Sequence, residues 1–299
     1  MALLLLALAW ARPAPAGAAV REYWIAAVPM SWDVAPNGGD PVMGTRLAPS
    51  ERRFVALVYR RYTPGFRKPW PNTAESADND GIPGPLIRAE VGDTVLVHFR
   101  NRDTHYGLPH SMHFHAFKYA PSSDGAYIPY RSGRGAAVPV GGSFTYRLKA
   151  VKDSYGVWPY HDHSPSMSQS IGLGMYGAIS IRRPGDPVPD REFVVYLENH
   201  LGLDTINGRA FVGNTPTFKA RRGDLVQWDV IGLGDGFHVF HVHGHRWLRH
   251  GTPVDSELVG PSSSLQVRFR EDAPGLWYYH CHVETHQDNG MIGLYRVLP

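Results

Sequence analysis

Four pairs of histidines, each separated by a single residue, are the feature of this 299-residue sequence most suited to chemistry. They are His113 and His115, His161 and His163, His241 and His243, and His280 and His282. On a β-strand, residues two apart project from the same face, about 7 Å from each other. One such pair is ordinary on a protein surface, but four predict a cluster of neutral imidazoles. Imidazole is a ligand for copper, zinc, iron or nickel.

The only cysteine, Cys281, stands between two of these histidines. In a regular strand its side chain points to the opposite face from theirs, so it predicts a second metal site one strand width away. Its other ligands there would be His238, His286 and Met291. Two histidines, a thiolate and a weak axial methionine are typical of a blue-copper electron-transfer site. Zinc would need a fourth strong ligand.

The elements that position these residues occur twice in the sequence. Each half has a Gly-Asp turn, an alternating strand, a His-x-His pair, an aromatic run into a second pair, and a Gly-Met-x-Gly strand. Strand signals are short and separated by turns, and no long segment has helical periodicity. We therefore expect an all-β fold of two tandem Greek-key β-sandwiches, residues 19–185 and 186–299, joined by a Pro- and Gly-rich stretch. Residues 62–85 are expected to form a surface loop.

Composition excludes several functions. The net charge is only +3, and the basic residues are spread along the chain, so nothing indicates a nucleic-acid partner or a membrane-surface patch. One cysteine cannot form an intramolecular disulfide.

The N-terminus, residues 1–18, is predicted to be a signal peptide. Its apolar run from Ala2 to Trp10 is too short to span a bilayer, and Ala16 and Ala18 have the spacing of a cleavage site. No basic residue precedes the run, so a mis-assigned start or a lipid-facing tail is the alternative. We expect a secreted or periplasmic protein, and no other segment is predicted to cross a membrane.

Four motifs, "HSMHFHAF", "YHDH", "HVFHVHGH" and "HCHVETHQDNGM", together resemble the multicopper oxidases, in particular their two-domain, small laccase-like branch. The resemblance extends from about Arg21 to the end of the chain. The stretches "REYWIAAVPMSWDVAP" and "GIPGPLIRAEVGDTVLVHFRN" are similar to the domain openings of ceruloplasmin and hephaestin. The resemblance implies that both sandwiches are cupredoxin-like and that the metal is copper.

The resemblance also implies a role for each ligand. Type 1 copper would be held by His238, Cys281, His286 and Met291, and type 2 copper by His113 and His241. The type 3 pair would be held by His115, His161, His163, His243, His280 and His282. The full set implies about four copper ions per chain. In the first domain Asp162 takes the place of Cys281, and the counterpart of His286 is missing, so that domain should carry no type 1 copper.

The ligands of the trinuclear cluster divide equally between the domains, so this site must lie between a first and a second domain. In two-domain relatives the two domains that form the site come from neighbouring chains in a head-to-tail ring. The resemblance therefore implies a homotrimer.

The implied reaction is one-electron oxidation of a phenolic or similar reducing substrate at type 1 copper, coupled to four-electron reduction of dioxygen to water at the cluster. Met291 as axial ligand favours a low-to-moderate reduction potential for type 1 copper. Tyr119, in an expected strand after His115, and Asp124 are candidates for redox or proton-donating groups beside the cluster. A core tyrosine and a turn aspartate are the plain alternatives. His245 is expected to be structural or to support a ligand.

Three other functions stay open. A metal-ion oxidase, acting on ferrous or cuprous ions, would use carboxylates near type 1 copper, and Glu257 and Glu284 are candidates. A copper nitrite reductase would carry its cysteine in the first domain and only three histidines at its second copper. A non-catalytic copper-binding protein would explain the histidines but not a thiolate site next to a cluster; oxygen consumption with a reductant separates it from an oxidase.

Overall fold

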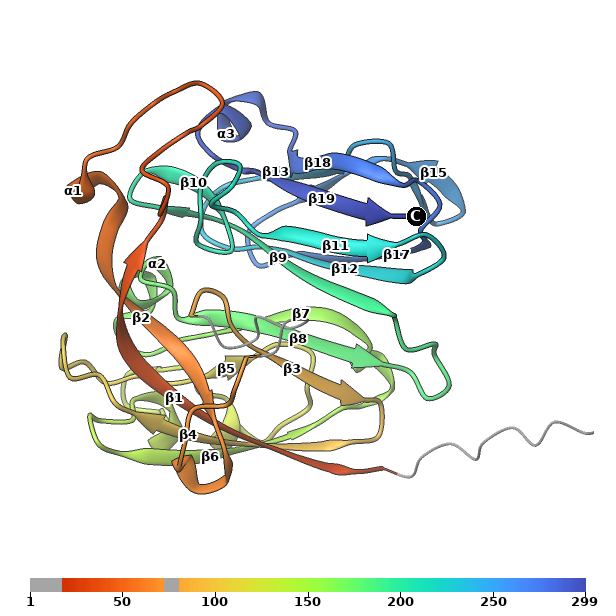
Figure 1. Ribbon diagram of the computed structural model, residues 1–299. Coiled ribbons are helices and arrows are strands. Elements are labelled where there is room, and N and C mark those ends of the chain that lie inside the picture. The colour runs from red at the N-terminus through yellow and green to blue at the C-terminus, as the bar shows by residue number, and fades with distance from the viewer. Residues whose placement is uncertain (1–17, 73–80) are drawn as a thin grey trace, which may run out of the picture.

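Two β-sandwiches, one from each half of the chain, lie against each other in the computed structural model (Figure 1). The structure describes residues 18–72 and 81–299. The predicted signal peptide therefore lies outside the described residues, except for its last position. The expectation of two tandem β-sandwiches is confirmed.

The first sandwich has two four-stranded sheets. One has the order β2 (Arg53–Tyr62), β1 (Val20–Asp33), β4 (Thr94–Asn101), β6 (Ser143–Lys149). The other has the order β3 (Gly84–Glu90), β8 (Tyr176–Arg182), β7 (Gly156–His161), β5 (His113–Phe114). The pairs β1–β4 and β3–β8 are parallel, and the others are antiparallel. The expected surface loop includes a 3₁₀ turn at Pro64–Phe66 and gives way to β3 at Gly84.

The second sandwich repeats this plan with one added strand. Its first sheet has the order β10 (Leu203–Ile206), β9 (Arg191–His200), β12 (Leu225–Gly232), β17 (Ser264–Arg270). Its second has the order β11 (Thr217–Arg221), β19 (Ile292–Leu298), β18 (Gly275–Cys281), β13 (His238–Val242), β16 (Ser256–Val259). The parallel pairs β9–β12 and β11–β19 match those of the first sandwich. The repeat in the sequence is thus a repeat in topology.

The remaining elements are short. A hairpin of β14 (Trp247–Arg249) and β15 (Thr252–Val254) follows β13. The helices are α1 (Pro49–Arg52), α2 (Met167–Gly172) and α3 (Glu284–Asp288), with further 3₁₀ turns at Pro121–Ser123, Arg134–Ala136 and Lys152–Ser154. Within the described residues, no helix is long and apolar enough to cross a membrane.

Each sandwich encloses its own aromatic core, because inward-facing side chains of both sheets alternate with outward-facing ones. In the first, Tyr59, Phe99 and Tyr146 are fully buried. In the second, Trp228 packs its ring against those of Phe240, Tyr279 and Tyr295, with ring centroids 5.0 to 5.6 Å apart. Cys281 belongs to this second core, so the thiol is enclosed by apolar groups.

A third core lies between the two sandwiches and joins them. It includes Trp32 and Tyr176 from the first half and Tyr196 and Phe211 from the second, each less than 9% exposed. The indole nitrogen of Trp32 donates to the carbonyl oxygen of Gly208, 2.6 Å away. Burial of this apolar surface holds the domains in one arrangement within the chain.

The turn after each first His-x-His pair has the same backbone conformation in both domains. Ala116 has φ of 70°, and its counterpart Gly244 has φ of 73°. An L-residue in this left-handed region costs roughly 1–2 kcal/mol, whereas glycine adopts it freely. Ala116, which stands where the second domain has a glycine, is therefore strained.

Replacing Ala116 with glycine should raise the free energy of unfolding by up to about 1 kcal/mol, since relief of the strain outweighs the extra chain entropy of glycine. Urea denaturation at fixed protein concentration measures the change. Gly244→Ala is the opposite control and should destabilise, because a Cβ there would also lie 2.8 Å from the Trp277 ring. An unchanged or lowered midpoint for Ala116→Gly would contradict this account.

Candidate metal centres

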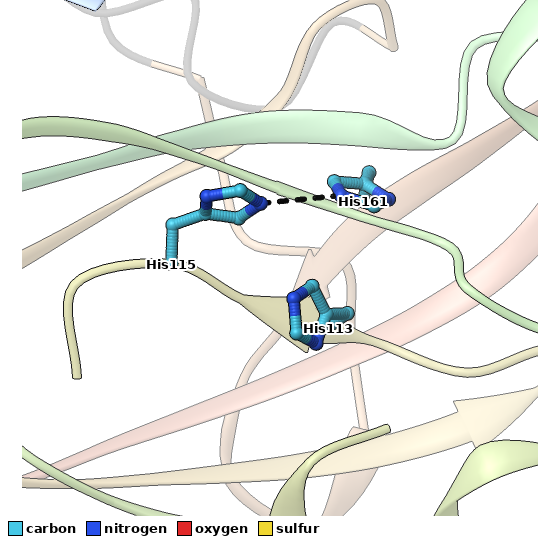
Figure 2. Close-up of side chains that lie close together, drawn as sticks. All are labelled: His113, His115 and His161. Atoms are coloured by element: carbon cyan, nitrogen blue, oxygen red, sulfur yellow. Dashed lines mark hydrogen bonds between the residues drawn. The ribbon is translucent and has the colours of Figure 1, made fainter. Parts of the chain in front are cut away.

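Four histidine rings of the first domain meet where β5 pairs with β7. His113 is the register partner of His161, and His115 and His163 follow two residues later on each segment. Neighbouring ring centroids lie 5.3 to 5.8 Å apart. The Nε2 atoms of His115 and His161 are 3.4 Å apart and face each other, with the His113 ring beside them (Figure 2). This group is named the first half-site.

Backbone carbonyls orient the rings of this half-site. Nδ1 of His113 lies 2.8 Å from the carbonyl oxygen of Asp124, and Nδ1 of His161 lies 2.9 Å from that of Asp162. A carbonyl oxygen only accepts, so each Nδ1 carries the proton and donates it. Nε2 is then left with its lone pair, which is the state required of a metal ligand.

The second domain builds the same arrangement, which is named the second half-site. His241 is the register partner of His280 on β13 and β18, and His243 and His282 complete the group. Ring centroids lie 5.1 to 5.4 Å apart. Nδ1 of His241 donates to the carbonyl oxygen of Asp255 at 2.7 Å, repeating the bond that His113 makes to Asp124. Nδ1 of His280 donates to its neighbour's carbonyl oxygen at 2.9 Å.

Burial favours the neutral form of four of these imidazoles. It lowers the pKa of His115, His161 and His280 to about 4, and the other histidines of each group act in the same direction. The pKa of His243 is lowered for the same reasons. At neutral pH the rings therefore offer lone pairs rather than repelling charges.

Cys281 lies on the core side of β18, with two histidine rings beside its sulfur atom. Sγ is 3.8 Å from Nδ1 of His238 and 3.7 Å from Nδ1 of His286, and those two nitrogens are 3.3 Å apart. Met291 is fully buried in the same core, and its carbonyl oxygen accepts the backbone N–H of Cys281 at 3.1 Å. The structure thus brings the Cys281 and histidine ligands together at one point, next to the methionine.

Two backbone N–H groups point at the sulfur. That of Val239 lies 3.4 Å from Sγ, and that of Val283 lies 3.5 Å away. Burial raises the pKa of the Cys281 thiol, and these hydrogen bonds oppose the increase because they favour the thiolate.

The donor sets fit copper. Metal–nitrogen and metal–sulfur bonds of about 2.0–2.3 Å can span donor atoms at these separations. A thiolate with two imidazoles and a thioether selects copper over harder ions. In each half-site the free Nε2 atoms converge, 3.4 Å apart in the first and 3.0 Å in the second.

The two half-sites are separate within one chain. Among the described residues, no group of metal-binding side chains combines histidines of both domains. The second half-site is also open to solvent, since His243 and His282 are exposed. Leu258 and Leu276, on the two strands that flank β13, are 62% and 54% exposed. This face therefore presents histidine and apolar side chains together to solvent.

Tyr119 and Asp124, the candidates for redox or proton-donating groups, lie beside the first half-site. The Asp124 carboxylate is 3.3 Å from Nδ1 of His113, and the Tyr119 and His113 ring centroids are 6.3 Å apart. Burial, together with the Asp124 carboxylate, raises the pKa of Tyr119 to about 12. The expected strand carrying Tyr119 is wrong: the left-handed turn at Ala116 ends β5, and only an isolated bridge at Lys118 follows. Their chemical roles remain predictions.

Three further acidic residues lie in the second domain, and two of them, Glu257 and Glu284, were candidates for a metal-ion oxidase. Glu257 accepts the indole N–H of Trp247 and pairs with Arg249, so it is already engaged. Glu284 is exposed at the start of α3. Asp255, the counterpart of Asp124, was not anticipated; only the symmetry of the repeat could have indicated it.

His245 is not placed as a ligand. Its Nδ1 donates to the carbonyl oxygen of His243 at 2.7 Å, and its Nε2 lies 3.0 Å from Oε1 of buried Glu271. A supporting position beside the second half-site fits its expected role.

Comparison with known proteins places these sites in a family. The multicopper oxidase family matches residues 71–186 and 187–299. A probable nitrite reductase-hydroxylamine oxidoreductase fusion protein of Kuenenia stuttgartiensis is 30% identical over 72% of this chain, which spans 27% of that protein. Human ceruloplasmin is 28% identical over 93% of the chain, which spans 31% of its length. The chain thus spans less than a third of these curated relatives.

Solved structures share the two-domain fold. The crystal structure of a multicopper oxidase superposes with a TM-score of 0.71 at 24% identity, covering 93% of this chain and 89% of that one. A copper nitrite reductase from Nitrosomonas europaea gives 0.69 at 20% identity, covering 93% and 94%. With two cupredoxin-like domains and two adjacent family matches across residues 71–299, the chain belongs to the multicopper oxidase family.

Proposed function

We propose that this protein is a laccase-like oxidase that takes single electrons from a phenolic or similar reducing substrate and passes them to dioxygen, forming water. The observation that carries the proposal is the position of Cys281 between His280 and His282. Its sulfur belongs to one donor set, while the rings of its two sequence neighbours belong to the other. Only short covalent paths separate the two sets.

Copper bound at these donors would supply the one-electron chemistry and the reduction of oxygen. The chain would do the rest. The N–H groups of Val239 and Val283 stabilise negative charge on Sγ, and the apolar core around Cys281 excludes water from it. Asp124 and Tyr119, which lie beside His113, would hold or donate a proton there.

We further propose that the oxidase is a homotrimer in which the first half-site of one chain meets the second half-site of the next. Each half-site offers only four imidazoles, and a single chain holds them apart. The exposed leucines beside the second half-site suit a protein interface, since apolar patches around a polar centre mark such surfaces. Head-to-tail contacts of this kind close into a ring. Secretion or export to the periplasm is proposed on the N-terminal sequence alone.

A metal-ion oxidase is the second candidate, and buried acid near the type 1 ligands favours it. Glu198 is 6% exposed, its Oε2 has no hydrogen-bond partner among the described residues, and burial raises its pKa to about 7. It lies beside Gly234, in the loop that leads to His238, where an added Cβ would be 2.5 Å from Oε1 of Glu198. Asp204 acts electrostatically on both His238 and Cys281. Two of the relatives are ferroxidases by name.

The deciding experiment combines copper analysis of the purified protein with absorption and EPR spectra and oxygen consumption. About four copper ions per chain, an intense blue thiolate band, and oxygen uptake with a phenol support the proposal. Faster turnover of ferrous or cuprous ions, with Glu198→Gln raising KM for the ion only, would favour the metal-ion oxidase. Two or fewer copper ions per chain, or no oxygen uptake, would contradict both.

Cys281→Ser should abolish the blue band and substrate-driven oxygen uptake, because a hydroxyl does not replace the thiolate at type 1 copper. The half-site histidines are untouched, so about three copper ions per chain should remain. Copper analysis and the near-ultraviolet spectrum measure this. A retained blue band would show that the sulfur is not the ligand.

Leu258→Asp and Leu276→Asp should separate the chains, because each places a charge on the proposed interface. All type 1 donors belong to the second domain, so the blue band should persist while type 2 and type 3 copper and oxygen reduction are lost. Analytical ultracentrifugation and copper analysis follow both changes. Val188→Asp, at a residue 69% exposed on the interdomain linker, is the matched control. Separated chains that retain every copper ion would exclude an intermolecular cluster.

A further inference from the structure

The place of Cys281 in the first domain is occupied by Asp162, and the backbone around it repeats the backbone around Cys281. The backbone N–H of Asp162 donates to the carbonyl oxygen of Met175 at 3.0 Å, as that of Cys281 donates to Met291 at 3.1 Å. His110 precedes His113 by three residues, just as His238 precedes His241. The first domain therefore keeps the framework of the type 1 site.

The Asp162 carboxylate also accepts the same two backbone donors as the sulfur. Oδ1 lies 2.7 Å from the N–H nitrogen of Ser111 and 3.3 Å from that of Ser164. These residues correspond in the repeat to Val239 and Val283, whose N–H groups point at Sγ. In both domains, two N–H groups converge on one position and so favour an anion there.

The His110 ring bridges two carboxylates in this site, which corresponds to the type 1 site of the second domain. Its Nδ1 lies 3.4 Å from Oδ2 of Asp162, and its Nε2 lies 3.2 Å from Oδ2 of Asp103. All three side chains are fully buried. Although burial opposes it, the two carboxylates raise the pKa of His110. The group is not among the clusters of the described residues that could hold a metal ion.

Asp162 is bonded directly to His161 and, through the Ser111 hydroxyl, to His163. Its carbonyl oxygen accepts Nδ1–H of His161 at 2.9 Å. Its Oδ1 accepts the hydroxyl of Ser111 at 3.1 Å, and the same hydroxyl oxygen accepts the backbone N–H of His163 at 3.0 Å. The carboxylate thus ties the segment before β5 to the end of β7, between the two imidazoles.

We propose that Asp103, His110 and Asp162, here named the buried triad, are positioning residues for the copper cluster: a metal-free replacement of a type 1 site that holds His161 and His163 in place. The inference rests on the proposed function, since it assumes that copper binds the first half-site. It extends that function by giving the domain without type 1 copper a defined task.

Asp162→Asn tests this, because it keeps the size of the side chain and removes its charge and one acceptor atom. Loss of groups that orient metal ligands typically lowers metal affinity about 10–100-fold. We expect that loss for type 2 and type 3 copper, measured by chelator competition with copper analysis, and a matching loss of the near-ultraviolet band. The blue band from Cys281, in the other domain, should keep its intensity and serves as an internal measure of folding.

Asp93→Asn is the matched control. Asp93 is also a buried carboxylate of the first domain, 3% exposed, which accepts N–H groups of Ala19 and Glu90 and pairs with Arg21. None of these three partners belongs to β5 or β7, so this variant should keep all its copper. Asp103→Asn changes the other carboxylate of the triad and should also lower the affinity of the cluster for copper. It gives a second test if Asp162→Asn does not fold.

Three results would overturn the inference. Both triad variants could bind cluster copper as tightly as the wild type, Asp93→Asn could lose it equally, or the blue band could fall in parallel with the cluster. The last two would mean general destabilisation. A wild-type protein that binds only type 1 copper would instead contradict the proposed function, and with it the inference, before any variant is compared.

Discussion

The alternation of side chains along β18 is the constraint on which the functional architecture depends. Because neighbouring residues of a strand face opposite sides, Cys281 enters the apolar core while His280 and His282 face the open side. A register slip of one residue would exchange these environments. The pairing of His241 with His280 therefore sets both donor groups at once, and the packed aromatic core behind β18 keeps that register.

Comparison of the two repeats separates what the fold supplies from what the side chains add. In both domains two backbone N–H groups converge on one position, and a histidine lies beside it. A thiolate there, with a second histidine on α3, gives a metal-binding set. A carboxylate there, with Asp103 on the far side of the imidazole, gives a closed ion-pair network. One backbone framework thus serves either a metal or a buried charge pair.

Much of this was predictable from the sequence, because strand periodicity and histidine spacing report directly on which side chains share a face. The two sandwiches, the two groups of four histidines and the set around Cys281 followed from those patterns. Tyr119 was misassigned to a strand, since φ at Ala116 is a backbone property that an alanine does not reveal. The contacts of His110 with Asp103 and Asp162 could not be predicted, because only the fold brings these residues together. The hydrogen bond from Trp247 to Glu257 likewise depends on the fold, because the two residues are not adjacent in sequence.

The donor groups differ in what holds them together. The ligands around Cys281 belong to one domain and one core, so packing within a single chain prearranges them. The half-sites lie on separate domains, and the third core, with Trp32 and Tyr196, fixes those domains in one arrangement. Among the described residues, no donor group combines histidines of both domains. In the proposed oxidase, electron entry would therefore be a property of each chain, whereas oxygen reduction would exist only in the assembly.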